Sequence, residues 1–358
     1  MTTTSSMLAA VVETLDGPFT IREIARPAPR AGEVLLRVVA AGTNPLDTKI
    51  RAGQAPHAHH ALPAVLGMDV AGVVESVGAD VSTFAPGDEV YGFTGGVAGL
   101  PGSHAQYLAA DARLLAHKPA NLSMREAAVL PLVVITAWEG LIDRARIAPG
   151  QTVLVQGGGG GVGHAAVQIA LAHGARVFAT AFDHDLAYVH SLGAVPIDAR
   201  RDVESYVAEH TAGRGFDVVY DTLGGSVLDA SFKAVARFGH VVSCLGWGTH
   251  ALAPLSFKQA SYSGVFTLHA LLADEGREHF GEILATITIL PSAGDCCPGL
   301  TRAPSRWRKR TQPTTQSSGE MGPSANRARS RCRSADRPRA FPIGRRRPVF
   351  PPFRKIPR

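Results

Sequence analysis

Gln151-Thr-Val-Leu-Val-Gln-Gly-Gly-Gly-Gly-Gly-Val-Gly163 is the stretch that decides the fold of this chain. Its first six residues predict a buried strand, because apolar side chains dominate them. Val162 to His173 predicts a helix, which Gly174 ends. Arg176 to Ala181 predicts a second strand. A strand, a glycine turn, a helix and another strand in this order indicate a parallel βαβ unit.

The turn satisfies the pattern G-x-G-x-x-G from Gly158 to Gly163. A run of five glycines matches this pattern easily, and the alternative is a flexible glycine loop. The strand before it and the helix after it favour a dinucleotide site. Glycines let the backbone approach a pyrophosphate, and the helix N-terminus offers free N–H groups. We therefore expect the cofactor to contact Gly158, Gly160, Gly161, Val162 and Gly163.

The end of the second strand decides which nicotinamide cofactor is preferred. Asp183 lies 20 residues after Gly163, where an acidic residue would hold the ribose hydroxyls of NADH. His184 and Arg200 are alternative partners for the 2′-phosphate of NADPH. Thr180, in the same strand, is a further predicted contact. The sequence leaves both cofactors open, with NADPH preferred.

Further strands frame this unit. Gly215 to Asp221 and His240 to Gly246 predict two more strands of a parallel, doubly wound sheet. Upstream, Glu33 to Ala40 and Asp69 to Val77 predict strands of a β-rich region. Ser123-Met-Arg-Glu126 has the spacing of a capping box, so we expect a helix to follow it.

Composition narrows the class of protein. Apolar residues make up 45% of the chain, which suits a globular protein. No stretch of 18 or more apolar residues occurs, so we expect no membrane span and no membrane partner. The N-terminus lacks the features of a secretory signal. The four cysteines, Cys244, Cys296, Cys297 and Cys332, form no CxxC pair, and we expect a cytoplasmic protein.

Charge is distributed unevenly along the chain. The segment 291–358 holds 17 of the 36 basic residues but 3 of the 30 acidic ones. The rest of the chain is therefore mildly acidic, and we expect no nucleic-acid partner. The same segment contains 11 of the 24 prolines without helical or strand periodicity, which predicts disorder. An Arg-rich nucleic-acid arm is the alternative reading of this segment.

The motifs together resemble the zinc-independent quinone oxidoreductase branch of the medium-chain dehydrogenase/reductase superfamily. The resemblance covers about Met7 to Ile289. It rests on Gly42–Arg51, Leu66–Val74, Pro86–Gly92, Thr136–Gly140, Gly157–Gly163 and Asp217–Gly225. It implies a GroES-like catalytic domain over 1–125, a Rossmann domain over 126–275 and a return to the catalytic domain over 276–290. It also implies a homodimer that reduces quinones or α,β-unsaturated carbonyls with NADPH.

The zinc enzymes of the superfamily place a cysteine ligand where this chain has Asn44. They place His and Glu where it has Met68 and Asp69. An amide and a thioether are poor zinc ligands, so we expect neither a catalytic nor a structural zinc. His57, His59 and His60 form a loop cluster for which metal binding is the minor alternative.

The resemblance also implies roles for individual residues. Asn44 is expected to touch the nicotinamide ribose or the substrate region, and Asp47 is expected at the same cleft wall, although turn chemistry alone would also explain them. Tyr91 is either a wall of this pocket, with a usable hydroxyl, or plain core. The cofactor is expected to meet Thr136 and to have its nicotinamide flanked by Gly246 and by a strand at Val265 and Phe266.

Both the resemblance and the periodicity stop at about Pro291, and we interpret the segment 291–358 as the product of a shifted reading frame. The catalytic domain would then lack its closing elements. A nicotinamide-binding protein with little catalysis is therefore the first alternative to the reductase. An alcohol dehydrogenase-like enzyme is the second, although the sequence shows no acid–base pair for it.

Overall fold

The computed structural model describes residues 5–289. The predictions made for 291–358, its disorder and its origin in a shifted reading frame, lie outside the described residues. Among the helices that the structure does describe, none is long and apolar enough to cross a membrane.

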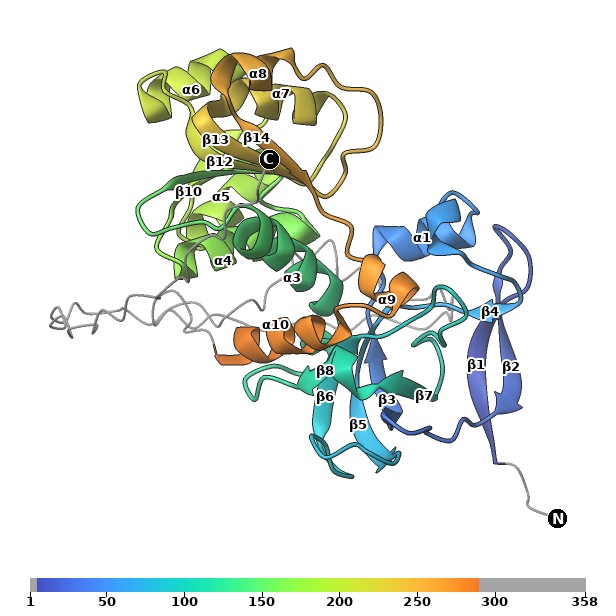
Figure 1. Cartoon of the computed structure of the whole chain (residues 1–358). Helices are drawn as coiled ribbons and strands as arrows, with labels where there is room; N and C mark the ends of the chain where they lie inside the picture. Colours follow the sequence, from blue (N-terminus) through green and yellow to red (C-terminus); the bar gives the residue numbers. More distant parts are fainter. Residues whose placement is uncertain (1–4, 290–358) are drawn as a thin grey trace, which may run out of the picture. The chain divides into compact units, whose positions relative to one another are not determined.

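A six-stranded parallel sheet forms the Rossmann part, with strand order β11-β10-β9-β12-β13-β14 (Figure 1). The chain runs outward from β9 in one direction and then, from β12, in the other, which confirms the doubly wound sheet. The strands are β9 (Thr152–Gln156), β10 (Arg176–Ala181), β11 (Val195–Asp198), β12 (Phe216–Asp221), β13 (Val235–Ser243) and β14 (Ser261–Gly264). Ligands of such sheets bind where the strand order reverses, here beyond the carboxyl ends of β9 and β12.

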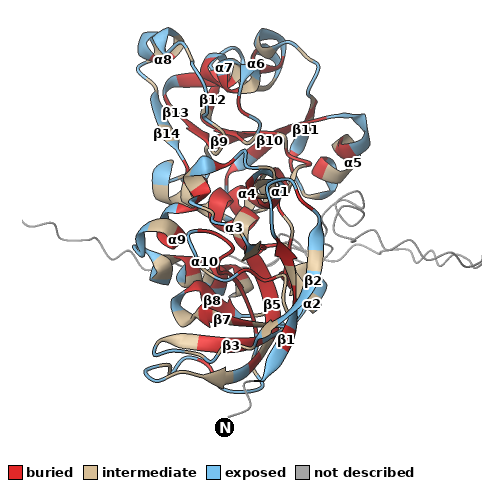
Figure 2. Cartoon of the chain, turned by 90° about the vertical axis from the view of Figure 1, so that its right-hand side faces the viewer, coloured by how far each residue is buried: buried red, intermediate tan, exposed pale blue. Residues whose placement is uncertain are grey.

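Helices enclose this sheet. They are α4 (Gly161–Ala172), α5 (Asp183–Ser191), α6 (Val203–Thr211), α7 (Ser226–Ala234) and α8 (Ala253–Lys258). The short helix α9 (His269–Ala273) lies beside the β-rich part (Figure 1). Val153, Leu154 and Val155 in β9 have no exposed surface. Val153 and Val155 belong to one hydrophobic cluster and Leu154 to another, so both faces of the sheet are covered (Figure 2).

The β-rich part contains two antiparallel sheets, with strand orders β2-β1-β4 and β7-β3-β5-β6-β8. The strands are β1 (Ser6–Val12), β2 (Phe19–Ala25), β3 (Glu33–Ala41), β4 (Ala64–Val65), β5 (Asp69–Val77), β6 (Glu89–Phe93), β7 (Tyr107–Asp111) and β8 (Leu115–His117). The short helix α1 (Pro45–Arg51) follows β3, and a 3₁₀ helix (Pro56–Ala58) follows α1. This arrangement confirms the predicted β-rich region.

The helix predicted after Ser123 is interrupted. Ser123 does form the capping box with Glu126, but α2 (Met124–Ala127) is one turn long. A new helix, α3 (Pro131–Trp138), begins at Pro131, and a π-helical turn (Glu139–Arg144) continues it. Proline lacks a backbone N–H and disfavours helical geometry in the residue before it, which explains the break.

Two predicted strand boundaries are wrong. The strand expected at His240 to Gly246 runs from Val235 to Ser243. Val265 and Phe266 are not in a strand, because β14 ends at Gly264 beside the last residue of β13. The chain leaves the sheet there, since no neighbouring strand remains to pair with. Both residues are thereby placed in a loop at the carboxyl edge of the sheet.

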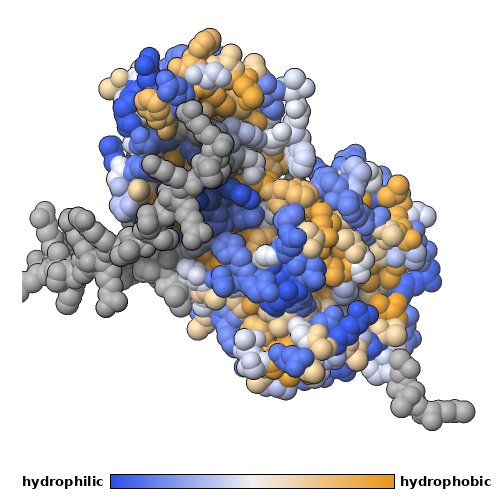
Figure 3. Space-filling view, viewed as in Figure 1, coloured by the Kyte–Doolittle hydropathy of each residue, from blue (hydrophilic) through white to orange (hydrophobic). Residues whose placement is uncertain are grey.

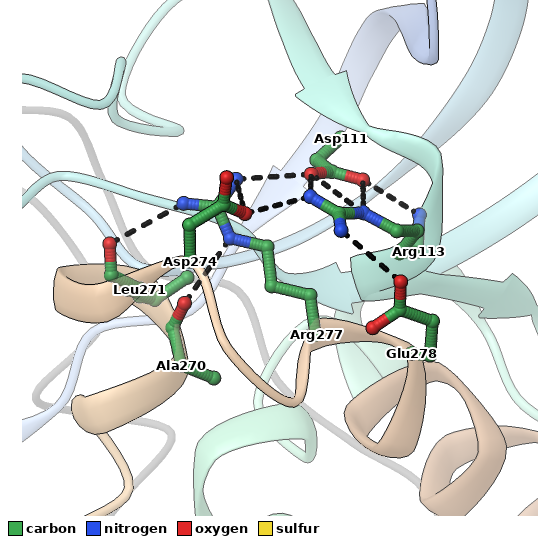
Figure 4. Close-up of polar contacts among 7 residues, drawn as sticks. All are labelled: Asp111, Arg113, Ala270, Leu271, Asp274, Arg277 and Glu278. Atoms are coloured by element: carbon green, nitrogen blue, oxygen red, sulfur yellow. Dashed lines mark hydrogen bonds and ion pairs between the residues drawn. The ribbon is translucent and has the colours of Figure 1, made fainter.

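Helix α10 (Arg277–Ile289) brings the chain back to the β-rich part, where it packs against β8 and the 3₁₀ helix Ala112–Leu114. Figure 4 shows the ion pairs that hold its start. The guanidinium of Arg277 lies 2.9 Å from Asp111 and 3.2 Å from Asp274. Arg113 contacts the same two carboxylates and also Glu278. Burial raises the pKa of Asp111, but hydrogen bonds from Arg113 and Arg277 hold it below its usual value.

Replacement of Arg277 by alanine should destabilise the protein measurably. The Arg277 side chain is 11% exposed and that of Asp111 is 16% exposed, so the carboxylate would lose a charged partner in a poorly hydrated place. We expect the free energy of unfolding to fall by about 1–3 kcal/mol. Arg22→Ala, which breaks an exposed pair with Glu13, should change it by about 0.5 kcal/mol or less. Urea unfolding of both variants tests this, and equal losses would contradict it.

Candidate functional site

A cavity of about 910 Å³ lies between the β-rich part and the carboxyl edge of the parallel sheet. Gly160, Thr222 and Cys244, which follow β9, β12 and β13, line it from the sheet. Asn44 and Leu46 line it from α1. Its walls are largely apolar, with Phe93, Leu130, Leu132, Val133, Val265 and Phe266 among them. A large cavity at the reversal point of the sheet is the expected place for a cofactor and a substrate.

The glycine turn presents its last residues to this cavity. Gly160, Gly161 and Val162 line it, and Gly160 is the N-cap of α4. Gly158 and Gly163 do not line it, so their predicted role changes from contact to packing. A Cβ on Gly163 would lie 2.1 Å from the Gly157 carbonyl oxygen, and one on Gly158 would lie 2.6 Å from Ala179 Cβ. These glycines allow the helix N-terminus to approach a ligand closely, which fits a dinucleotide pyrophosphate.

Thr180 braces the turn from β10. Its hydroxyl donates to Gln156 Oε1 at 2.8 Å and accepts from the Gly157 amide at 3.0 Å. Its carbonyl oxygen accepts from the Gly158 amide at 2.9 Å. Thr180 is 4% exposed and does not line the cavity, so it fixes the shape of the turn instead of making the predicted cofactor contact.

His164 is a lining residue that the sequence analysis missed. It is 2% exposed, and its Nδ1 donates to the Gly160 carbonyl oxygen at 3.1 Å. Its Nε2 is buried without a hydrogen-bond partner among the described residues. Burial lowers the pKa of His164, so the ring is neutral. An unsatisfied polar atom beside a helix N-terminus is typical of a ligand site. Its position one residue after the glycine motif is the signal that was available.

The residues predicted to decide between NADH and NADPH lie close to one another and are not part of the cavity lining. Asp183 and His184 begin α5, directly after β10. Arg200 follows β11 and pairs with Asp183 and Asp198. The side chains of Asp183 and Arg200 are 69% and 58% exposed, so both remain accessible to a ligand. The structure thus brings the three predicted residues to one edge, and their roles stay predictions.

Asn44 reaches the cavity, where a buried hydrogen-bond system holds it. Its Nδ2 donates to Asp69 Oδ2 at 2.8 Å, and the other oxygen of Asp69 accepts from the Leu132 amide at 3.0 Å. Leu132 is in the first turn of α3, whose free N–H groups favour a negative charge. Burial raises the pKa of Asp69 well above its usual value, the Asn44 amide counteracts this, and the nearby Asp47 carboxyl adds to the increase.

Asp47 lies behind the cavity wall, so the prediction that it faces the substrate is wrong. It is 4% exposed, and its Oδ2 accepts from the Asn44 amide at 2.7 Å. This bond places Asp47 in the first turn of α1, where it closes the turn that begins with Asn44. Burial raises the pKa of Asp47 to about 7, against the lowering effect of its hydrogen bonds with Asn44.

Thr136 lines the cavity, and its predicted contact with the cofactor stays a prediction. It is 4% exposed, its hydroxyl donates to the Leu132 carbonyl oxygen at 2.6 Å, and Thr267 Oγ1 lies 2.9 Å away. Tyr220 donates to the Thr136 carbonyl oxygen at 2.7 Å. Val265 and Phe266 come from the same loop as Thr267 and also line the cavity. Thr136, Val265, Phe266 and Thr267 thus line the cavity together. The resemblance assigns Val265 and Phe266 to the nicotinamide and Thr136 to its ribose, and these contacts stay predictions.

Two further predicted site residues, Tyr91 and Gly246, also do not line the cavity. Tyr91 has no exposed surface, and its hydroxyl donates to the Leu284 carbonyl oxygen in α10 at 2.8 Å. It is therefore core, and its hydroxyl holds the returning helix. Gly246 lies between two lining residues, Leu245 and Trp247. A Cβ on Gly246 would lie 2.1 Å from Tyr262 Oη, so its role is a close approach within the protein.

The residues present do not fit a zinc ion. Asn44 and Asp69 are bonded to each other, and Met68 is fully buried in the core. Within residues 5–289, no group of three His, Cys, Asp or Glu side chains is placed to bind a metal. His57 is instead stacked on Trp247, with ring centroids 5.3 Å apart. Cys244 also lines the cavity, and burial raises the pKa of its thiol to about 12.

Comparison with known proteins agrees with this architecture. Residues 30–120 match the alcohol dehydrogenase GroES-like domain, and residues 161–286 match the zinc-binding dehydrogenase family. A crystal structure of an alcohol dehydrogenase superfamily protein from Novosphingobium aromaticivorans is 70% identical. It has a TM-score of 0.79 and covers 79% of this chain and 86% of its own.

Two curated relatives add detail. The quinone oxidoreductase of Pongo abelii is 31% identical over 298 residues, 81% of this chain and 89% of the relative. The 2-methylene-furan-3-one reductase of Solanum lycopersicum is 39% identical over 241 residues, 66% of this chain. The match spans 59% of the length of that plant protein.

The glycine turn at α4, the paired β-rich and parallel sheets, and these matches lead to one assignment. The chain belongs to the medium-chain dehydrogenase/reductase superfamily, in the branch that contains quinone and alkenal oxidoreductases.

Proposed function

We propose that this chain is an NADPH-dependent reductase of α,β-unsaturated carbonyl compounds or quinones. The observation that carries the proposal is a single cavity with the α4 N-terminus at one wall and Asn44 and Thr136 at others. A nicotinamide cofactor bound there supplies the hydride. The chain's own residues orient it, exclude water with apolar walls and offer the Asn44 amide near the acceptor.

The carboxyl and thiol groups in and near the cavity favour an acceptor that needs little acid catalysis. The two carboxyls nearest Asn44, Asp47 and Asp69, do not line the cavity. Cys244 is held as a neutral thiol, and the Glu126 carboxylate is bonded to Ser123. A conjugated enone or a quinone spreads the charge that develops after hydride addition, so it depends less on a proton donor than an isolated carbonyl does.

NADPH is preferred in this proposal because Arg200 and His184 lie beside the first turn of α5. The Arg200 side chain is exposed, and a guanidinium binds phosphate oxygens in a forked geometry. Asp183 competes for this guanidinium and is the group that would hold the ribose of NADH. The named NADPH-dependent alkenal/one oxidoreductase of Arabidopsis thaliana, 39% identical over 238 residues, supports the same preference.

A homodimer is part of the proposal. β14 is the last strand at one side of the parallel sheet in the described part of the chain. Phe257 in α8 is 83% exposed and Tyr262 in β14 is 39% exposed. Hydrophobic residues gather over α7 and α8 in Figure 3. Burial of such a surface against a second copy would remove it from water. Light scattering on the purified chain should give twice the monomer mass.

Titration with both cofactors, followed by an acceptor panel, tests the function. We expect NADPH to bind at least about tenfold more tightly than NADH, as one charged phosphate contact provides. An enone and a quinone should then be reduced, and a simple alcohol should not be oxidised. Cofactor binding without turnover of any acceptor would favour a binding protein, and alcohol oxidation would favour a dehydrogenase. Either result would contradict the proposal.

Gly160→Ala should separate cofactor binding from folding. An added Cβ would have the Gly157 carbonyl oxygen 3.2 Å away as its sole neighbour within 4 Å, so the fold should tolerate it. The methyl would project where the pyrophosphate approaches, and we expect cofactor affinity to fall by about tenfold or more. The melting temperature should change little. The matched control is Gly264→Ala, whose Cβ would have its nearest neighbour at 3.9 Å. Unchanged affinity in Gly160→Ala would refute the assigned turn.

Asp47→Asn should alter how stability depends on pH. The folded pKa of about 7 exceeds the value of about 3.9 expected in the unfolded chain, so stability is lost as pH rises through the folded pKa. Asparagine keeps an acceptor for the Asn44 amide but has no proton to lose. The variant should therefore gain stability relative to the wild type between pH 5 and 7, by up to about 2 kcal/mol, and hold that gain above pH 7. A pH-independent difference in urea unfolding would rule this out.

A further inference from the structure

Three aromatic side chains from separate parts of the chain meet at the cavity. His57 is in the 3₁₀ helix after α1, Trp247 follows β13 and Phe266 follows β14. The His57 and Trp247 rings are stacked, with 22° between their planes and centroids 5.3 Å apart. Phe266 stands at 64° to His57, with centroids 5.7 Å apart, and at 85° to Trp247, with centroids 6.1 Å apart. We call these three residues the aromatic wall.

The aromatic wall retains surface for a ligand. Trp247 is 59% exposed and Phe266 is 36% exposed, although both line the cavity. His57 covers one face of the indole and Phe266 stands nearly perpendicular to it, so much of the indole remains open. Large exposed aromatic rings at a cavity offer stacking area that folding alone does not use.

The loop that carries Trp247 is anchored, so the ring is held in place. On one side, Gly246 is packed so closely to Tyr262 Oη that a Cβ would lie 2.1 Å from that oxygen. On the other side, Gly248 has a φ of +130°, a backbone conformation that residues with a side chain rarely adopt. The two glycines set the path of the loop, and Trp247 is the residue between them that reaches the cavity.

The charges of the cavity disfavour a cationic ligand at these rings. Lys49 and Arg125 line the cavity, and the carboxylate of Glu126 is the one acidic side chain among its described lining residues. Glu126 accepts hydrogen bonds from the Ser123 amide and hydroxyl. A cation bound on the indole would thus be repelled by two positive side chains. It would be attracted by one carboxylate, which already accepts hydrogen bonds from Ser123. A neutral, flat π system is the better match.

We infer that the aromatic wall makes this chain selective for enones that carry a flat aromatic ring on the β-carbon, over aliphatic enones. The inference rests on the proposed function and adds the class of acceptor to it. Hydride from the nicotinamide would add to the β-carbon and a proton from solvent to the α-carbon, while the ring stacks on Trp247. Stacking of the acceptor's ring on Trp247 should increase the affinity for the acceptor by roughly 2- to 10-fold.

Trp247→Leu tests the inference with two acceptors, 4-phenyl-3-buten-2-one and 3-hepten-2-one. The wild type should favour the phenyl compound in kcat/KM. In Trp247→Leu the ratio of kcat/KM for the phenyl compound to that for the aliphatic compound should fall about 3- to 10-fold, mainly through a higher KM for the phenyl compound. In His57→Leu the same ratio should fall by less. Phe238→Leu is the control, because Phe238 is an exposed aromatic residue, 76% exposed, that does not line the cavity.

A second measurement does not depend on turnover. Binding of the saturated product 4-phenyl-2-butanone, followed by calorimetry, should weaken in Trp247→Leu and stay unchanged in Phe238→Leu. If the wild type reduces both enones and neither the ratio nor product binding changes in Trp247→Leu, the aromatic wall is refuted and the proposed function stands. If the wild type reduces neither these enones nor a quinone but product binding still weakens in Trp247→Leu, the proposed function fails and the aromatic wall stands as a binding surface.

Discussion

The buried carboxyl group of Asp69 joins the two halves of the site. One oxygen holds the Asn44 amide, and the other accepts an N–H from the first turn of α3, which carries Thr136. Loss of this group would leave two buried donors without a partner, each at a cost of about 1–3 kcal/mol. The cavity therefore has its shape because one side chain satisfies both the β-rich part and the helix that leads into the parallel sheet. The resemblance marked this position as a departure from zinc chemistry, and the structure gives it a positive role.

The glycine turn could be predicted because its signal is local. The strand, the glycines and the helix follow one another within a few residues. The positions that need glycine to avoid a clash can therefore be recognised directly in the sequence. Gly163 illustrates this, since the 2.1 Å approach of a Cβ to the Gly157 oxygen leaves no other residue type possible without rearrangement. The sequence also pointed to Thr180 in β10, although as a cofactor contact. In the structure its hydroxyl is bonded to Gly157 and Gln156 instead.

The remaining site residues depend on contacts that sequence order does not reveal. Tyr91 became core because α10, almost 200 residues later, supplies the acceptor for its hydroxyl. Trp247 and His57 lie 190 residues apart and meet only when the two parts of the chain face each other. A tryptophan between two glycines after a strand of the parallel sheet was the available signal for this contact. The break between α2 and α3 was also readable, since Pro131 is visible in the sequence.

Cys244 has a consequence for the durability of such a site. Enones and quinones are electrophiles that add thiolates, so the proposed acceptors could alkylate a reactive cysteine in the wall of the cavity. Burial, together with the nearby Asp221 carboxylate, raises the pKa of this thiol to about 12. The fraction present as thiolate at neutral pH is then about five orders of magnitude below unity. Cys244 is the only cysteine among the described lining residues. The apolar surroundings that shape the cavity thus also keep its thiol unreactive.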